Sequence, residues 1–150
     1  MANIEQTFQD VISRIWTEAV GTELTKVDLA DAPLTDPLSA SVPFLGDWEG
    51  DIEVQVDEDL ARTVGAKMLF IDPDDLSDDD LKDALGEVTN MIGGSLRASL
   101  STTCGLGTPT VVGPGDLVMR SGESTVLFAH GYLSNSQPIR ITLRAEQGPA

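Results

Sequence analysis

The spacing of the hydrophobic residues changes along this chain from the period of a helix to that of a strand, and this change constrains the fold most. From residue 5 to about 20, apolar side chains recur at helical spacing, and Gly21 follows where a helix would end. Over residues 51–56, apolar and polar residues alternate, which is typical of a strand with one buried face. The preceding segment 46–50 begins and ends with glycine, so we expect a hairpin with a partner strand around residues 42–45.

Two more helices are predicted before residue 102. The first begins at the acidic residues 57–59 and should end near Phe70. Its apolar positions are four residues apart, at Leu60, Val64 and Met68. The acidic, proline-containing segment 72–75 breaks the chain. Ser77 and Asp80 then have the spacing of a capping box, so a third and longer helix should begin there.

The remaining segments favour extended structure. Three prolines make residues 28–43 a connecting stretch that ends in an extended segment. Segments rich in β-formers follow over residues 109–112, 125–133 and 139–143. Helices between hairpin-linked strands, without regular βαβ alternation, favour one α+β domain over residues 1–150. We expect three helices on one face of a largely antiparallel sheet of five or six strands, built from two similar halves.

The charge balance excludes several classes of partner. The chain has 9 Lys and Arg against 25 Asp and Glu, a net charge of −16. Nucleic acid and anionic membranes are therefore not expected as partners, because both require clustered cations. The single Cys104 excludes an internal disulfide and a thiolate zinc site. The first residues lack the basic and apolar regions of a signal peptide, so we expect a cytoplasmic protein.

Familiar catalytic and metal sites are disfavoured. His130 is the only imidazole and lies in a strand-like segment, so we interpret it as structural. Three aspartates between residues 72 and 83 have part of the spacing of a calcium loop, but Ser77 occupies the place of the required glycine. The glycines at 105–107 and 113–115 lack the Lys-Ser/Thr of a phosphate loop. No metal site is expected.

The third helix carries the most informative pattern. At 100° per residue, seven positions would face the core, namely Leu81, Leu85, Val88, Ile92, Ser95, Leu96 and Ser99. The opposite side carries a row that we call the polar ridge, namely Asp83, Glu87, Asn90, Gly94 and Arg97. Any surface helix has a polar face, but the pair Gly93-Gly94 costs about 2 kcal/mol relative to alanines. Such a cost on an exposed face suggests that another molecule approaches the backbone there.

Residues 83–90, with Asp83, Glu87 and Asn90, resemble the D/S-x3-E-x2-N motif of the CheX, CheC and FliY family of chemotaxis phosphatases. Residues 50–56 resemble the family's central hairpin, and residues 107–113 its proline-containing segment after the active helix. Pro109 follows Asn90 more closely than in the family pattern, and Pro114 is an alternative match. The first helix has Asp-x3-Arg-x2-Thr in the equivalent register, which is more similar to single-site CheX than to two-site CheC.

The resemblance implies a CheC-like fold and hydrolysis of the aspartyl phosphate on a CheY-type receiver domain. Asn90 would orient the attacking water, and Glu87 would bind a receiver lysine. Further partner contacts would come from Asp83, Gly93, Gly94, Arg97 and Pro109. The protein would need no cofactor of its own, because Mg²⁺ would belong to the receiver.

The single-site members that this chain resembles also imply a homodimer. Two alternatives stay open. One is a receiver-binding or flagellar-switch module of the same fold without catalysis, and the other is a plain structural domain.

Overall fold

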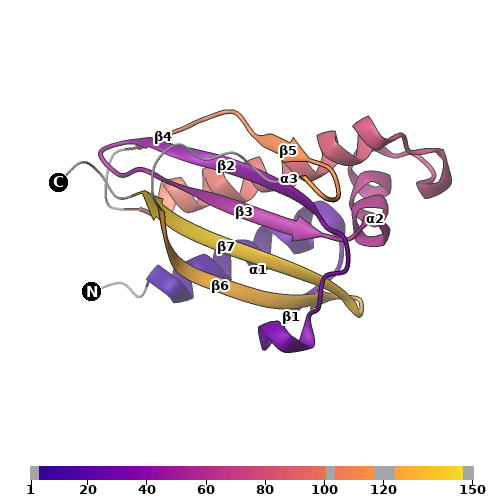
Figure 1. Ribbon diagram of the computed structural model, residues 1–150, viewed down its shortest axis with the longest axis horizontal. Helices are drawn as coiled ribbons and strands as arrows, with labels where there is room; N and C mark the ends of the chain where they lie inside the picture. Colours follow the sequence, from indigo (N-terminus) through magenta and orange to yellow (C-terminus); the bar gives the residue numbers. More distant parts are fainter. Residues whose placement is uncertain (1–3, 101–103, 117–123, 147–150) are drawn as a thin grey trace.

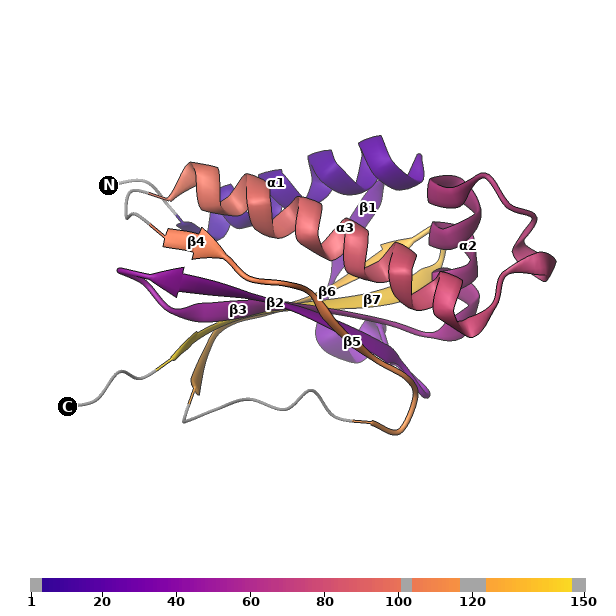
Figure 2. The same cartoon turned by 90° about the horizontal axis from the view of Figure 1, so that it is seen from above.

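One antiparallel sheet carries three α-helices on one of its faces (Figures 1 and 2). The computed structural model describes residues 4–100, 104–116 and 124–146. The helices in these ranges are α1 (Ile4–Val20), α2 (Glu58–Leu69) and α3 (Asp78–Ser99), with short 3-10 helices η1 (Leu29–Asp31) and η2 (Pro73–Asp75). The strands are β1 (Leu24–Val27), β2 (Leu38–Gly46), β3 (Gly50–Val56), β4 (Cys104–Leu106), β5 (Thr110–Val112), β6 (Ser124–Ser134) and β7 (Gln137–Glu146). The expected α+β class is confirmed.

The strand order supports the expectation of two similar halves. The path across the sheet is β1-β6-β7-β3-β2-β4, and β5 pairs with β2 beside β4. Each half therefore contributes a helix, a short edge strand and a hairpin: α1, β1 and β2–β3, then α3, β4 and β6–β7. The short strand of each half pairs with the hairpin of the other half. As a result, α1 and α3 occupy corresponding places on the covered face of the sheet (Figure 2).

The predicted helices agree closely with the structure. Apolar side chains of α1 are buried, among them Phe8, Ile12 and Trp16. Helix α2 ends at Leu69, and Phe70 follows in the left-handed conformation that often closes a helix. The capping box is present: Asp80 N donates to Ser77 Oγ at 3.1 Å, and Ser77 N donates to Asp80 Oδ2 at 3.0 Å. This box fixes where α3 begins.

The predicted strands need correction at three places. Strand β2 begins at Leu38, inside the segment predicted to be a connector. Strands β1 and β4 are absent from the prediction, and both are edge strands of three or four residues. The sheet in the described ranges has seven strands instead of five or six.

Strand β3 does not have the single buried face that its alternation predicts. Asp51 and Glu53 are only 7% and 5% exposed. Arg144 on β7 compensates their burial by pairing with both, at 3.5 Å from Asp51 Oδ2 and 3.0 Å from Glu53 Oε1. Ser41 on β2 also donates to Asp51 at 2.9 Å. Ion pairs and a hydrogen bond therefore take the place of hydration for the carboxylates on this face of β3.

Candidate functional site

Helix α3 presents the polar ridge to solvent along one side. Asp83, Glu87 and Arg97 are exposed, whereas Asn90 and Gly94 are half-buried. The core-facing side is broader than predicted and consists of Leu81, Ala84, Leu85, Gly86, Val88, Thr89, Ile92, Gly93 and Leu96. Ser95 and Ser99 were expected on that side, but Ser95 is half-buried and Ser99 is exposed. The difference arises because β4 and β5 pack against one flank of α3 and extend its buried surface.

Glu87 and Asn90 are available to a partner molecule. They are three residues apart on α3, so their side chains lie next to each other on the helix surface. Within residues 4–100, 104–116 and 124–146, neither side chain has a hydrogen bond or ion pair. An amide and a carboxylate that project side by side without internal partners can both bind groups of another molecule.

The two adjacent glycines have different environments. Gly93 is buried, and a Cβ at this position would lie 3.3 Å from Leu106 Cδ1 and 3.6 Å from side-chain carbons of Ile52 and Val42. Gly93 therefore allows α3 to pack closely on the sheet, and it does not lie on the exposed surface where a partner contact was expected. Gly94 has only Leu106 Cδ2 at 4.0 Å and remains on the half-exposed ridge.

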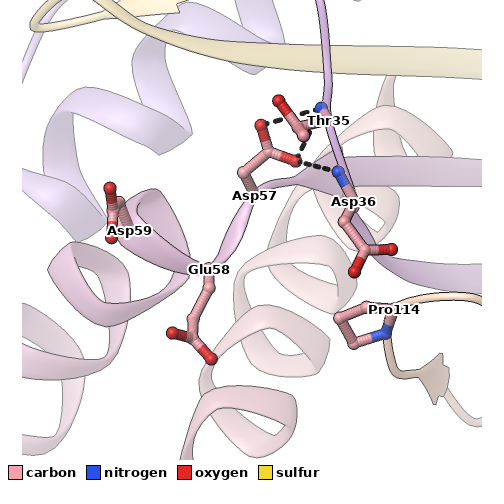
Figure 3. A pocket seen from close by; sticks show the side chains of 6 residues that line it. All are labelled: Thr35, Asp36, Asp57, Glu58, Asp59 and Pro114. Atoms are coloured by element: carbon pink, nitrogen blue, oxygen red, sulfur yellow. Dashed lines mark hydrogen bonds between the residues drawn. The ribbon is translucent and has the colours of Figure 1, made fainter.

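Pro109 lies beside the ridge, as expected from the residues after α3. Its Cβ would be 3.7 Å from a Cβ built on Gly86, which precedes Glu87 directly. Pro114, the alternative match, lies elsewhere, in a pocket at the beginning of α2 (Figure 3). The structure therefore favours Pro109 as the proline of the site.

The pocket of Figure 3 is acidic and was not predicted from the sequence. Its lining residues are Thr35, Asp36, Asp57, Glu58, Asp59 and Pro114. Asp57 accepts hydrogen bonds from the backbone N–H of Thr35 at 3.1 Å and of Asp36 at 3.0 Å. These hydrogen bonds hold the residues that precede β2 against the N-terminal end of α2, where Asp57 is the N-cap. Among the described residues, no group of His, Cys, Asp or Glu has an arrangement that could hold a metal ion.

His130 has the structural role expected of it. It is 6% exposed, its Nε2 lies 3.0 Å from Glu5 Oε1, and its ring packs edge-on against Phe8. Burial, assisted by the nearby positive charge of Lys26, lowers the pKa of His130, while Glu5 opposes this effect. The neutral imidazole of His130, on β6, therefore makes a structural contact with α1. The polar ridge lies on a different helix, α3.

The equivalent positions on α1 are also exposed. Asp10, Arg14 and Thr17 occupy on α1 the register of Asp83, Glu87 and Asn90. An arginine in the place of the glutamate reverses the charge, and a threonine lacks the amide. At these equivalent positions, α3 has the carboxylate and amide of Glu87 and Asn90 and α1 does not.

The chain is similar to proteins of one family. The family model for chemotaxis phosphatase CheX matches residues 38–130. The crystal structure of chemotaxis protein CheX from Vibrio vulnificus has a TM-score of 0.78 at 23% identity, over 97% of each chain. CheX from Desulfovibrio desulfuricans has a TM-score of 0.76 at 29% identity, over 95% of this chain and 99% of that one. No curated protein sequence matches.

A third structure is that of a complex. The CheX-CheY-BeF3-Mg²⁺ complex from Borrelia burgdorferi contains a chain with a TM-score of 0.72 at 17% identity, covering 98% of this chain and 100% of that one.

No helix in the described ranges is long and apolar enough to cross a membrane.

Proposed function

The chain belongs to the CheX family of chemotaxis phosphatases, and on that premise we propose that it hydrolyses the aspartyl phosphate of a CheY-type receiver domain in the cytoplasm. The observation that carries this proposal is the side-by-side, unpartnered pair of Glu87 and Asn90 on the polar ridge. On α1 the exposed amide of Gln6 and carboxylate of Asp10 bond to each other, and the one histidine is buried in a structural contact, so neither is as available to a partner as Glu87 and Asn90. A ridge of this kind can complete the active site of another protein.

The proposed chemistry is an in-line attack by water. The amide oxygen of Asn90 accepts a hydrogen bond from the water, and its NH₂ group can donate to a phosphoryl oxygen, so one side chain aligns both reactants. The water oxygen forms the new bond to phosphorus as the bond to the receiver's aspartate oxygen breaks. The products are inorganic phosphate and a free aspartate carboxylate. The receiver's Mg²⁺ neutralises the phosphoryl oxygens.

Glu87 would fix the position of the two proteins. Its carboxylate is exposed and can form a charge-assisted hydrogen bond with a receiver lysine beside the phosphate. This bond would place Asn90 within reach of the phosphorus. The related Borrelia CheX has a structure in complex with CheY, BeF3 and Mg²⁺, which supports a receiver as the partner.

The decisive experiment is a turnover assay. A phosphorylated CheY-type receiver with Mg²⁺ is mixed with a substoichiometric amount of this protein, and phosphate release is followed. We expect acceleration over many turnovers per molecule. A rate equal to the receiver's own dephosphorylation, across several receivers, would contradict catalysis and favour a receiver-binding module.

Removing the Glu87 carboxylate should weaken receiver binding. We expect Glu87→Ala to raise Kd about tenfold at low ionic strength, and the difference should shrink as salt screens the ion pair. Glu18→Ala is the control, because it removes one exposed charge from α1 and leaves the ridge intact. A Glu87→Ala variant that binds like the control at low salt would exclude the proposed lysine contact.

We also propose that the protein is a homodimer that pairs through β6. Strand β1 covers the outer edge of β6 only from Gly131 to Ser134. From Val126 to His130, no described strand pairs with that edge, and Val126 and Leu127 there are 52% and 42% exposed. An open edge with exposed apolar side chains can pair with its copy in a symmetric dimer.

Sedimentation at low and high salt tests the dimer. Two chains of net charge −16 repel each other, so association should strengthen as ionic strength rises. We expect a dimer at micromolar concentration in high salt. A monomer under both conditions would contradict the proposal.

A further inference from the structure

Two prolines interrupt the sheet beside the polar ridge. Along β2, Ser39 to Ser41 pair with β5, whereas Phe44 to Gly46 pair with β4. Pro43 lies between these two paired segments, and Pro109 lies in the connection between β4 and β5. Neither proline has a backbone N–H to donate to a strand ladder. Residues 107–109 therefore connect β4 and β5 without regular pairing.

This irregular connection is held at both of its ends. Gly107 N donates to Pro43 O at 2.9 Å, and a Cβ on Gly107 would lie 2.5 Å from Pro43 Cγ, so the backbone is pressed against β2. At the other end, Pro109 packs beside Gly86 of α3. Thr108 is the exposed residue between these two anchors.

The same connection lies alongside Asn90. Leu106 side-chain carbons would lie 3.3 and 4.0 Å from Cβ atoms built on Gly93 and Gly94, and Pro109 Cβ would lie 3.7 Å from one built on Gly86, so both residues pack beside α3. Asn90 is four residues, about one helical turn, from both Gly86 and Gly94. Figure 2 shows the segment from β4 to β5 running along the flank of α3. Thr108 lies between Leu106 and Pro109 in the connection, and Asn90 lies between Gly86 and Gly94, beside which those two residues pack. Thr108 and Asn90 are therefore at similar heights on two neighbouring segments.

We propose that Thr108 is a further receiver-contacting residue, which touches the receiver next to its phosphorylated aspartate while Asn90 holds the water. The inference rests on the proposed function and adds a contact outside the helix. A receiver that brings its phosphoryl group to Asn90 must also cover the adjacent surface, where Thr108 is exposed. A neutral hydroxyl can donate a hydrogen bond near a phosphoryl group, whereas a carboxylate there would repel it.

The test compares one substitution at two threonines. Thr110 is also exposed and lies two residues further along, in β5. Thr110 pairs with Ser41 of β2 and so belongs to the regular sheet, whereas Thr108 lies in the irregular connection before β5. We expect Thr108→Asp to raise the KM for phosphorylated receiver, and the Kd for BeF3-activated receiver, about tenfold. Thr110→Asp should stay within about twofold of wild type, and Thr108→Ser should retain activity.

The possible outcomes distinguish a failure of the Thr108 inference from a failure of the proposed function. If wild type is active and Thr108→Asp binds as Thr110→Asp does, Thr108 does not contact the receiver and the inference is overturned. Equal weakening by both variants would show general repulsion by added charge, and would also overturn it. If wild type accelerates no receiver, the proposed function itself fails. Melting temperatures of all three variants should match wild type, because both threonines are exposed.

Discussion

Asn90→Ala should lower the rate of receiver dephosphorylation about 100-fold, which is the usual cost of removing one polar group that acts on the transition state. The Kd for BeF3-activated receiver should change less than about threefold, since the substitution removes little contact area. Asn90 is half-buried and has no internal partner among the described residues, so the folded state loses no hydrogen bond. Alanine is also the better helix former. The measurements are single-turnover phosphate release and binding by titration.

The second helix of the pseudo-symmetric pair supplies the control for this result. Thr17 occupies on α1 the place that Asn90 has on α3, and it is exposed. Thr17→Ala should leave both rate and Kd unchanged. Loss of binding or folding in Asn90→Ala, with the rate lowered only in proportion, would show that Asn90 is a docking or structural residue instead of the group that orients water.

The polar ridge could be predicted because the features that define it are local. Ser77 and Asp80 fix the first turn of α3, and the helical period then determines which side each later residue faces. Asp83, Glu87 and Arg97 are consequently exposed, as predicted. Their grouping into a receiver-binding site does not follow from periodicity and came from the resemblance to a family motif.

The edge strands could not be predicted because they depend on distant partners. Strand β1 has four residues and β4 has three, too few to show a period of two. Each is held by pairing with the hairpin of the other half, β6 for β1 and β2 for β4. The prolines of residues 28–43 likewise led to a wrong prediction, a connector where the structure has the first part of β2. Pro43 is compatible with β2 because it lies where neither β4 nor β5 pairs with it.

The burial of Gly93 could not be predicted for a related reason. Helical angles alone place it at the border between the core side and the ridge, and they do not reveal that β4 packs against that border. Leu106 of β4 supplies the contact that buries Gly93. The two neighbouring glycines thus have different environments: Gly93 is packed against the sheet, and Gly94 lies on the ridge proposed to bind the receiver.

Introducing leucine at each glycine in turn should separate these two properties. Gly93→Leu should lower the free energy of unfolding by about 2 kcal/mol or more, because the side chain would be forced against Ile52, Val42 and Leu106. Gly94→Leu should leave stability equal or raise it by up to about 0.8 kcal/mol, since leucine is a better helix former and a Cβ there has only ordinary contacts. Chemical denaturation measures both values.

Receiver binding should show the opposite order. Gly94→Leu places a bulky side chain on the polar ridge one turn beyond Asn90, so we expect its Kd for BeF3-activated receiver to rise about tenfold or more with the fold intact. Gly93→Leu, measured in the folded fraction at low temperature, should bind within about threefold of wild type, because its new side chain faces the sheet. Tight binding by Gly94→Leu would mean that the receiver docks on the Glu87 side of the ridge without approaching the backbone at Gly94, and the conformational cost of this glycine would then need a different explanation.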